Sequence, residues 1–148
     1  AQGLFARYGK TVTEEGIYKA YDMFEGITAY VQRIMHDVFT ETVTGGTADV
    51  DLVDNMTDRF IEESSRRIRE QLSVITEQQK ELLYAIHSEG IAKGLTASAF
   101  VKRHRLKSAS SVQSATKQLL EMDLITKVGN EYTLSDPLLK LWLTREIQ

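Results

Sequence analysis

The sequence predicts a mainly α-helical chain with one small β-hairpin near its C-terminus. Apolar residues recur every three or four positions over most of the chain, which is the spacing of one helix face. Two short β-prone runs, 124–128 and 131–134, flank Gly129-Asn130, a pair that can adopt the positive φ of a tight hairpin turn. With 148 residues and 42% hydrophobic content, the chain is expected to form one globular domain or two small ones.

Composition excludes several classes of protein. The chain contains no cysteine, so it has neither a disulfide framework nor a thiolate metal site, and a cytoplasmic location is expected. No apolar run approaches the roughly 18 residues that a membrane span requires, so no membrane partner is expected. The first residues contain neither an initiator methionine nor a signal peptide, which indicates a fragment or a processed chain.

Residues 12–75 are predicted to form a small helical bundle. Thr13 is the expected N-cap of a first helix that ends at Gly26. A second helix follows Thr28, and Asp49 is the expected cap of a third. The predicted apolar faces contain Ile17, Ala20, Tyr21 and Phe24 in the first helix, Tyr30, Val31, Ile34, Met35, Val38 and Phe39 in the second, and Val50, Val53, Met56, Phe60 and Ile61 in the third.

Residues 76–148 are predicted to form a winged helix-turn-helix. A capping-box pattern at Thr76 opens a helix, a short second helix starts near Thr96, and a third starts near Ser108. Three helices with a tight second turn are typical of a helix-turn-helix, and the hairpin that follows them is then a wing. Pro137 opens a last amphipathic helix, since proline is tolerated in a first turn.

A basic stretch lies inside this second module. Residues 96–123 contain 5 Lys and Arg against 2 Asp and Glu, whereas residues 1–75 contain 8 against 13. The third helix of a winged helix enters the major groove of DNA, where its exposed side chains contact bases and phosphates. The candidate DNA-binding residues are Lys102, Arg103, Arg105 and Lys107 in the basic stretch, Ser110, Ser111, Gln113, Ser114 and Lys117 on the third helix, and Lys127 and Asn130 on the wing. A solvated basic face without nucleic acid stays open as the alternative.

No catalytic site and no metal site are predicted. The Gly-x-x-x-x-Gly-Lys-Ser/Thr loop is absent from the sequence, so this chain is not expected to hydrolyse ATP by itself. The three histidines lie far apart in the sequence, without a second ligand at metal spacing. Adjacent acidic residues such as Glu62-Glu63 diverge around a helix and are expected to be solvated.

Two stretches of the sequence resemble one family of prokaryotic ATPases. Residues 78–143, which end in the run from Asp136-Pro137 to Trp142-Leu143, resemble the C-terminal winged helix of AAA+/STAND-type P-loop ATPases. Residues 14–40, with Gly26 to Gln32 as their most specific part, resemble the helical lid that follows the nucleotide-binding core. The resemblance implies a lid-like bundle over residues 1–75 and a winged-helix domain over residues 76–148.

The resemblance also implies a partner and a cofactor outside this chain. The partner is an N-terminal ATPase core of the parent protein, and that core would bind ATP and Mg²⁺. Many lids place an arginine shortly after the helix-breaking glycine, and Arg33 is the nearest candidate for such a nucleotide contact here. Pairing of Arg33 with Asp37, four residues along the same helix, is the competing interpretation. The winged helix would bind DNA or pack on the core, and the nucleotide state would tilt the lid.

Two other functions remain open at this point. A free-standing winged-helix transcription regulator would dimerise through residues 12–75 and bind a palindromic site. A protein-interaction module would bind neither nucleic acid nor nucleotide, and its binding would not follow the salt dependence of phosphate contacts. The oligomeric state is not predicted by the sequence.

Overall fold

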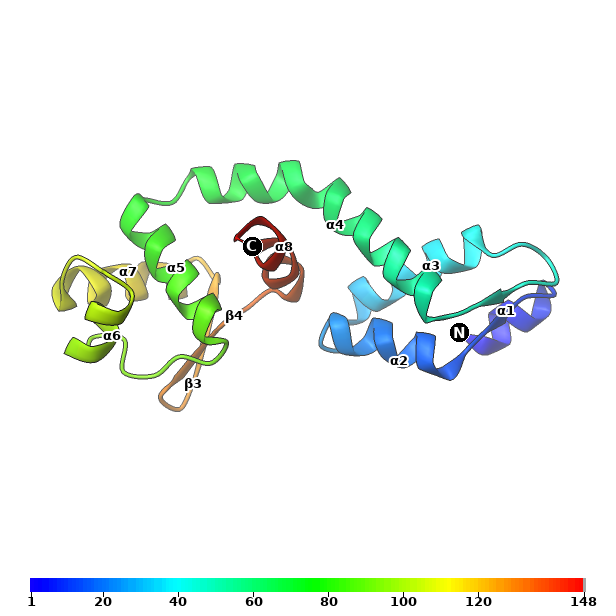
Figure 1. Ribbon diagram of the computed structural model, residues 1–148, viewed down its shortest axis with the longest axis horizontal. Helices are drawn as coiled ribbons and strands as arrows, with labels where there is room; N and C mark the ends of the chain where they lie inside the picture. The colour runs from blue at the N-terminus through cyan, green and yellow to red at the C-terminus, as the bar shows by residue number, and fades with distance from the viewer. Residues whose placement is uncertain (148) are drawn as a thin grey trace. The chain divides into compact units, whose positions relative to one another are not determined.

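The computed structural model describes residues 1–147 and confirms the mainly α-helical fold with its small β-hairpin (Figure 1). The helices are α1 (Gln2–Arg7), α2 (Glu14–Met23), α3 (Thr28–Glu41), α4 (Val50–Ser73), α5 (Glu77–Glu89), α6 (Ser98–Arg103), α7 (Ala109–Glu121) and α8 (Pro137–Ile147), and the strands are β1 (Thr11–Val12), β2 (Thr47–Ala48), β3 (Ile125–Val128) and β4 (Glu131–Leu134). The chain divides into two compact units, one formed by Ala1–Ser64 and the other beginning at Ser65. Helix α4 therefore contributes residues to both units.

The first unit is built on helices α2, α3 and the first half of α4. The Thr13 hydroxyl accepts a hydrogen bond from the Gly16 N–H at 3.0 Å, and the Asp49 carboxylate accepts one from the Leu52 N–H at 3.1 Å, so both predicted caps are confirmed. Five apolar side chains of the predicted helix faces are fully buried in this unit: Ala20, Phe24, Ile34, Val38 and Val53.

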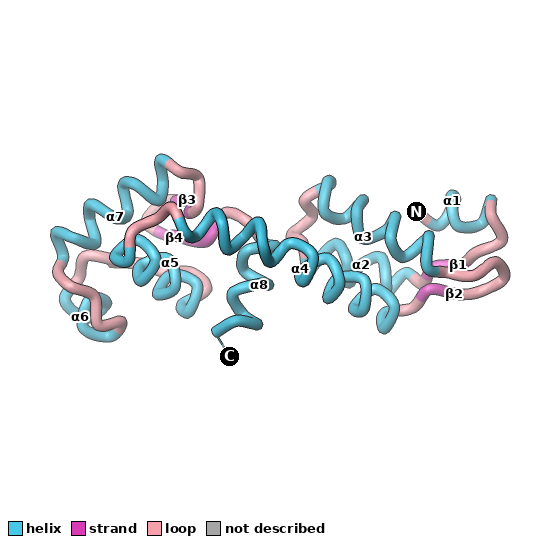
Figure 2. Tube along the Cα trace, turned by 90° about the horizontal axis from the view of Figure 1, so that it is seen from above, coloured by secondary structure: helices cyan, strands magenta, loops and turns pink. Residues whose placement is uncertain are grey.

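Three features of the first unit differ from the sequence prediction. Helix α1 was not predicted, nor were strands β1 and β2, which pair in parallel with Thr11 opposite Thr47 and lie next to each other in Figure 2. The prediction that Tyr21 belongs to the buried face is wrong, because 55% of Tyr21 is exposed. Strands β1 and β2 were not predicted because two residues are too few to show the alternation of a strand. Tyr21 is exposed because a tyrosine ring carries a hydroxyl and is tolerated on a face that contacts water.

The second unit contains the predicted three-helix arrangement of α5, α6 and α7. The capping box that opens α5 is confirmed, since Thr76 and Gln79 exchange side-chain to backbone hydrogen bonds. The Gln79 amide also donates to the Gln118 carbonyl oxygen on α7, which joins the first and third helices. The apolar core between them contains Leu82, Leu83 and Ile86 from α5, Phe100 from α6, and Val112, Ala115 and Leu119 from α7.

The hairpin and the last helix complete the second unit. Strands β3 and β4 are antiparallel, with Ile125 opposite Leu134 and Lys127 opposite Tyr132, and Gly129 takes the positive φ of 62° expected at the turn. Helix α8 begins at Pro137 as predicted and buries Leu138, Leu139 and Leu143. Among residues 1–147, no helix combines the length and the apolar character that crossing a membrane demands.

Candidate nucleic-acid interface

Helix α7 presents one polar stripe to solvent. Ser110, Gln113, Lys117 and Glu121 recur at spacings of three and four residues and are all exposed, with Ser114 exposed beside them. The opposite face of the helix carries Val112, Ala115 and Leu119, each no more than 4% exposed. Packing of that apolar face against α5 thus determines which side chains of α7 remain available to a ligand.

The β3–β4 hairpin forms a wall beside this stripe. Directly opposed residues of an antiparallel pair lie on the same face, so Lys127 and Tyr132 continue the face whose buried residues are Ile125 and Leu134. The Lys127 ammonium lies 5.5 Å from the centre of the Tyr132 ring. Tyr132 is held in turn by two backbone hydrogen bonds to Ala92, of 2.8 and 2.9 Å, which form a single antiparallel β-bridge beside the hairpin.

A groove of about 510 Å³ lies between helix α7 and the hairpin. Its lining is Gly94, Leu95 and Thr96 from the segment before α6, Gln113, Thr116, Lys117, Leu120 and Glu121 from α7, and Lys127, Asn130 and Tyr132 from the hairpin. Four predicted DNA-binding residues, Gln113, Lys117, Lys127 and Asn130, therefore line one groove. The other predicted residues do not line it.

The second unit thus contains three helices, a hairpin and a last helix, and a comparison against known families identifies its family. A family model described as a probable winged helix domain matches residues 67–145, more than half of the chain. The chain belongs to this winged helix family. No curated protein and no solved structure matches the chain.

Within the winged helix, the basic stretch divides into held and unpaired side chains. The Glu89 carboxylate at the end of α5 accepts from the Arg103 guanidinium and contacts the His104 Nε2 at 2.7 Å. These two partners, His104 first, lower the pKa of Glu89 below its ordinary value. The other three cations of the stretch, Lys102, Arg105 and Lys107, are exposed, and none of them forms an ion pair among the described residues.

The serines at the start of α7 are used by the fold itself. Ser108 accepts from the Ser111 N–H at 3.1 Å, and the Ser111 hydroxyl accepts from the Ser108 N–H at 3.2 Å, which makes a second capping box. The Ser110 hydroxyl lies 3.1 Å from that of Ser108. Ser111 is half-buried in this cap, whereas Ser110 is exposed one turn before Gln113.

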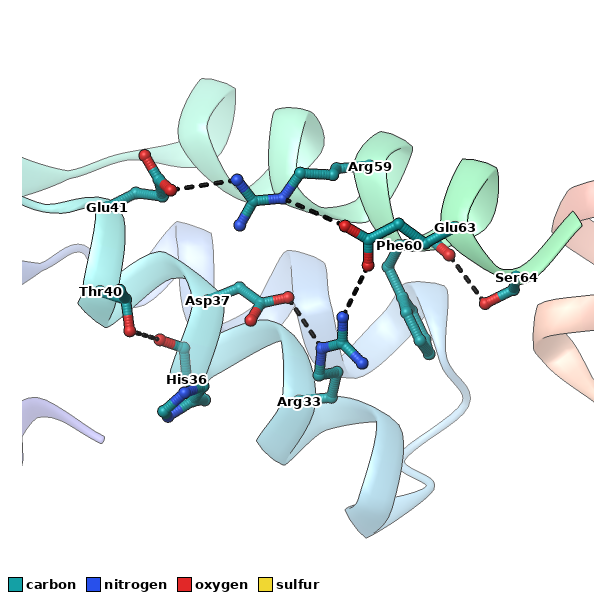
Figure 3. A network of polar contacts seen from close by, with 9 residues as sticks. All are labelled: Arg33, His36, Asp37, Thr40, Glu41, Arg59, Phe60, Glu63 and Ser64. Carbon is teal, nitrogen blue, oxygen red and sulfur yellow. Dashed lines mark hydrogen bonds and ion pairs between the residues drawn. The ribbon is translucent and has the colours of Figure 1, made fainter.

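Arg33, the predicted nucleotide contact, lies in the first unit within a network of charged residues (Figure 3). Its Nε donates to Asp37 at 2.9 Å, its Nη2 donates to Glu63 at 2.8 Å, and its guanidinium lies 4.7 Å from the centre of the Phe60 ring. The competing interpretation, a pair with Asp37, is therefore confirmed. Binding of a nucleotide phosphate by Arg33 stays a prediction, and two carboxylates already accept hydrogen bonds from this guanidinium.

A second concavity of about 730 Å³ lies on helices α5 and α8 and contains no part of α7 or the hairpin. Tyr84 and His87 line it, and His87 Nε2 lies 3.2 Å from the Thr144 hydroxyl. Burial lowers the pKa of His87, with a smaller contribution from Lys140, and burial also raises the pKa of Tyr84. Across residues 1–147, no group of three or more His, Asp or Glu side chains could hold a metal ion.

Sequence reasoning missed three residues of this interface. Glu89 lies 14 positions before Arg103, so no local spacing connects them. The sequence predicts Tyr132 only as part of a β-prone run, although its position opposite Lys127 follows from the two-residue turn. Glu121 is exposed on α7, and its place in the groove depends on where the hairpin packs.

Proposed function

We propose that the winged helix binds duplex DNA through the exposed stripe of α7 and the hairpin. The observation that carries the proposal is the shared groove in which Gln113, Lys117, Lys127 and Asn130 converge from two elements. An α-helix with its side chains is about as wide as the major groove, and glutamine can pair with the N6 and N7 positions of adenine. Lysines at both walls would then contact the phosphates on either side.

The distribution of charge supports contact with a polyanion through the second unit. Residues 65–148 contain 13 Lys and Arg against 9 Asp and Glu, and residues 1–64 contain 5 against 12. A phosphate backbone is therefore attracted to the winged helix and repelled by the first unit. Glu121 is the one acidic side chain in the lining of the groove, so it limits how closely a phosphate can approach the C-terminal end of α7.

The test is the affinity of the whole chain for a labelled random-sequence duplex, measured by fluorescence anisotropy at two salt concentrations. If about four phosphates are neutralised, affinity falls roughly a hundredfold between about 50 and 200 mM salt. The double variant Lys117→Glu/Lys127→Glu should abolish binding at the higher salt. Arg66→Glu/Arg67→Glu is the matched control, because it changes the charge of the chain equally at exposed positions of α4 that do not line the groove. Absence of binding by the wild-type chain at low salt contradicts the proposal.

A second function is proposed from the ATPase resemblance: this chain forms the lid and winged helix that follow a P-loop core. The continuity of α4 supports it, because a single helix contributes residues to both units. ATP and Mg²⁺ would bind the core, and the chain alone would bind neither. Limited proteolysis of the parent protein tests this function, since identical cleavage of residues 1–148 with and without ATP and Mg²⁺ contradicts it.

A stable homodimer of the isolated chain that binds a palindromic duplex would instead favour the free-standing regulator.

A further inference from the structure

Helix α6 ends in a turn that places an arginine in a backbone conformation suited to glycine. The Leu106 N–H donates to the Val101 carbonyl at 2.9 Å and the Arg105 N–H donates to the Lys102 carbonyl at 3.2 Å, the two hydrogen bonds of a Schellman motif. Arg105 is the residue that must adopt the left-handed conformation in this motif, and its φ is 53°. A side chain with a Cβ is disfavoured there, because the Cβ approaches the following carbonyl oxygen.

Among the described residues, three other helices end with the same turn. At the end of α2 the position is taken by Glu25, with a φ of 53°. At the end of α1, Gly9 occupies the equivalent position with a φ of 69°, and the Lys10 N–H donates to the Phe5 carbonyl at 2.8 Å. At the end of α7 the position is taken by Asp123, with a φ of 57°. Aspartate visits the left-handed region more readily than arginine does. Glycine or aspartate would therefore suit the turn after α6 better than Arg105 does.

Nothing within the described part of the chain uses the Arg105 side chain. It is exposed, and no carboxylate, ring or carbonyl among residues 1–147 contacts its guanidinium. The contrast with its neighbours is direct, because Glu89 holds both Arg103 and His104. Glu89 thereby ties the end of α5 to the end of α6 through Arg103 and His104.

We propose that Arg105 binds a phosphodiester oxygen of nucleic acid, and that the strained turn is retained because it keeps an exposed arginine in the loop between α6 and α7. The inference rests on the proposed function, since the anion is the backbone of the duplex that α7 reads. It also divides the basic stretch by role: Arg103 and His104 hold the fold, and Arg105 holds the ligand. A guanidinium presents several N–H donors that match the oxygens of a phosphate.

The substitution Arg105→Gly separates the two roles of the residue. It removes the guanidinium and relieves the backbone, so it should raise the Tm of the second unit by about 2 to 4 °C while it weakens binding of the labelled duplex about tenfold at low salt. The slope of log affinity against log salt should fall by about one phosphate contact. Arg105→Lys keeps the charge and the strain, so it should bind nearly as well as the wild-type chain, without the gain in Tm.

Asp123→Gly is the matched backbone control, because it relieves the same turn at the other end of α7 without removing a cation. It should raise the Tm and leave affinity unchanged or higher. If the wild-type chain binds the duplex and Arg105→Gly binds equally well, the inference is overturned while the proposed function stands. If Arg105→Gly lowers both affinity and Tm, the loss comes from the fold and the inference is also overturned. If the wild-type chain binds no duplex at any salt concentration, both are overturned.

Discussion

The indole Nε1 of Trp142 donates a hydrogen bond of 2.9 Å to the hydroxyl of Ser65, which joins the last helix α8 to helix α4 at 77 positions' distance in the sequence. Both residues are buried, with exposed fractions of 7% and 8%. The Arg69 guanidinium, one turn further along α4, lies 5.8 Å from the Trp142 ring and pairs with Glu146 at 3.5 Å. The polar group of Trp142 thus specifies where α8 packs, while its ring contributes the apolar contact.

Substitution of Ser65 by alanine should destabilise the second unit by about 1 to 3 kcal/mol, because it leaves the buried indole N–H without a partner. Urea unfolding followed by the emission of Trp142, the single tryptophan of the chain, measures this directly. Ser73→Ala is the control, since Ser73 lies on the same helix and is exposed. Equal stability of the two variants would show that the Ser65 hydrogen bond contributes nothing.

Substitution of Thr57 by valine should stabilise the first unit by about 1 kcal/mol, because it replaces a buried hydroxyl that lacks a partner with a methyl group of the same shape. Thr57 is fully buried on α4, and its Oγ1 forms no hydrogen bond among the described residues. Thr116→Val is the matched control on a buried helical threonine whose hydroxyl donates to the Val112 carbonyl at 2.7 Å. That control should be neutral or destabilising in thermal unfolding; a loss of stability in Thr57→Val would contradict the prediction.

The stability of the second unit should fall as the pH falls below about 6.5, because burial lowers the pKa of His87 in the folded chain. The unfolded chain then takes up the proton first, so protonation favours unfolding. Glu89 also makes the folded state less stable as the pH falls, but at lower pH. Its pKa is lowered in the folded chain, so this stabilisation is lost once the pH drops below the ordinary glutamate pKa of 4.5. Urea midpoints measured between about pH 7.5 and pH 5.5 should decline in the wild-type chain and stay nearly level in His87→Gln. Parallel curves for the two proteins would exclude His87 as the cause.

Substitution of Arg33 by glutamine should destabilise the first unit by only about 0.5 to 1 kcal/mol, since 43% of the Arg33 side chain is exposed and its ion pairs are screened by water. The difference from the wild-type chain should shrink at high salt, where the two carboxylates interact less with the guanidinium. Arg7→Gln is the control, because Arg7 lies on α1 and forms no ion pair among the described residues. A cost that is independent of salt would point to packing on Phe60 as the main contribution.

Local chemistry explains which elements were predictable. The caps at Thr13, Thr76 and Ser108, and the turn at Gly129-Asn130, depend on hydrogen bonds and φ preferences within a few residues. Both partners of each such interaction lie within a few residues of each other in the sequence, so the boundaries of the helices can be predicted from them. Strands β1 and β2 were missed because their pairing spans 36 positions between Thr11 and Thr47 and leaves no local pattern.

The candidate site was predictable only in part. Gln113 and Lys117 are exposed on α7 as the helical period predicts, and both line the groove with Lys127 and Asn130. The charge count predicts one basic patch, because net charge does not report which side chains are in contact. The structure instead pairs Arg103 with Glu89 and leaves Arg105 exposed in a left-handed turn, two facts that the charge count could not contain.

The sequence by itself determined where each helix of the second unit begins, which face of α7 is apolar and where the hairpin turns, because each of these depends on neighbours within one or two turns of chain. Only the tertiary structure decided which cations are held and which polar groups share a groove. Those relationships join residues from different elements, such as Glu89 with Arg103 and Lys127 with Lys117, and they exist only once the apolar faces have packed.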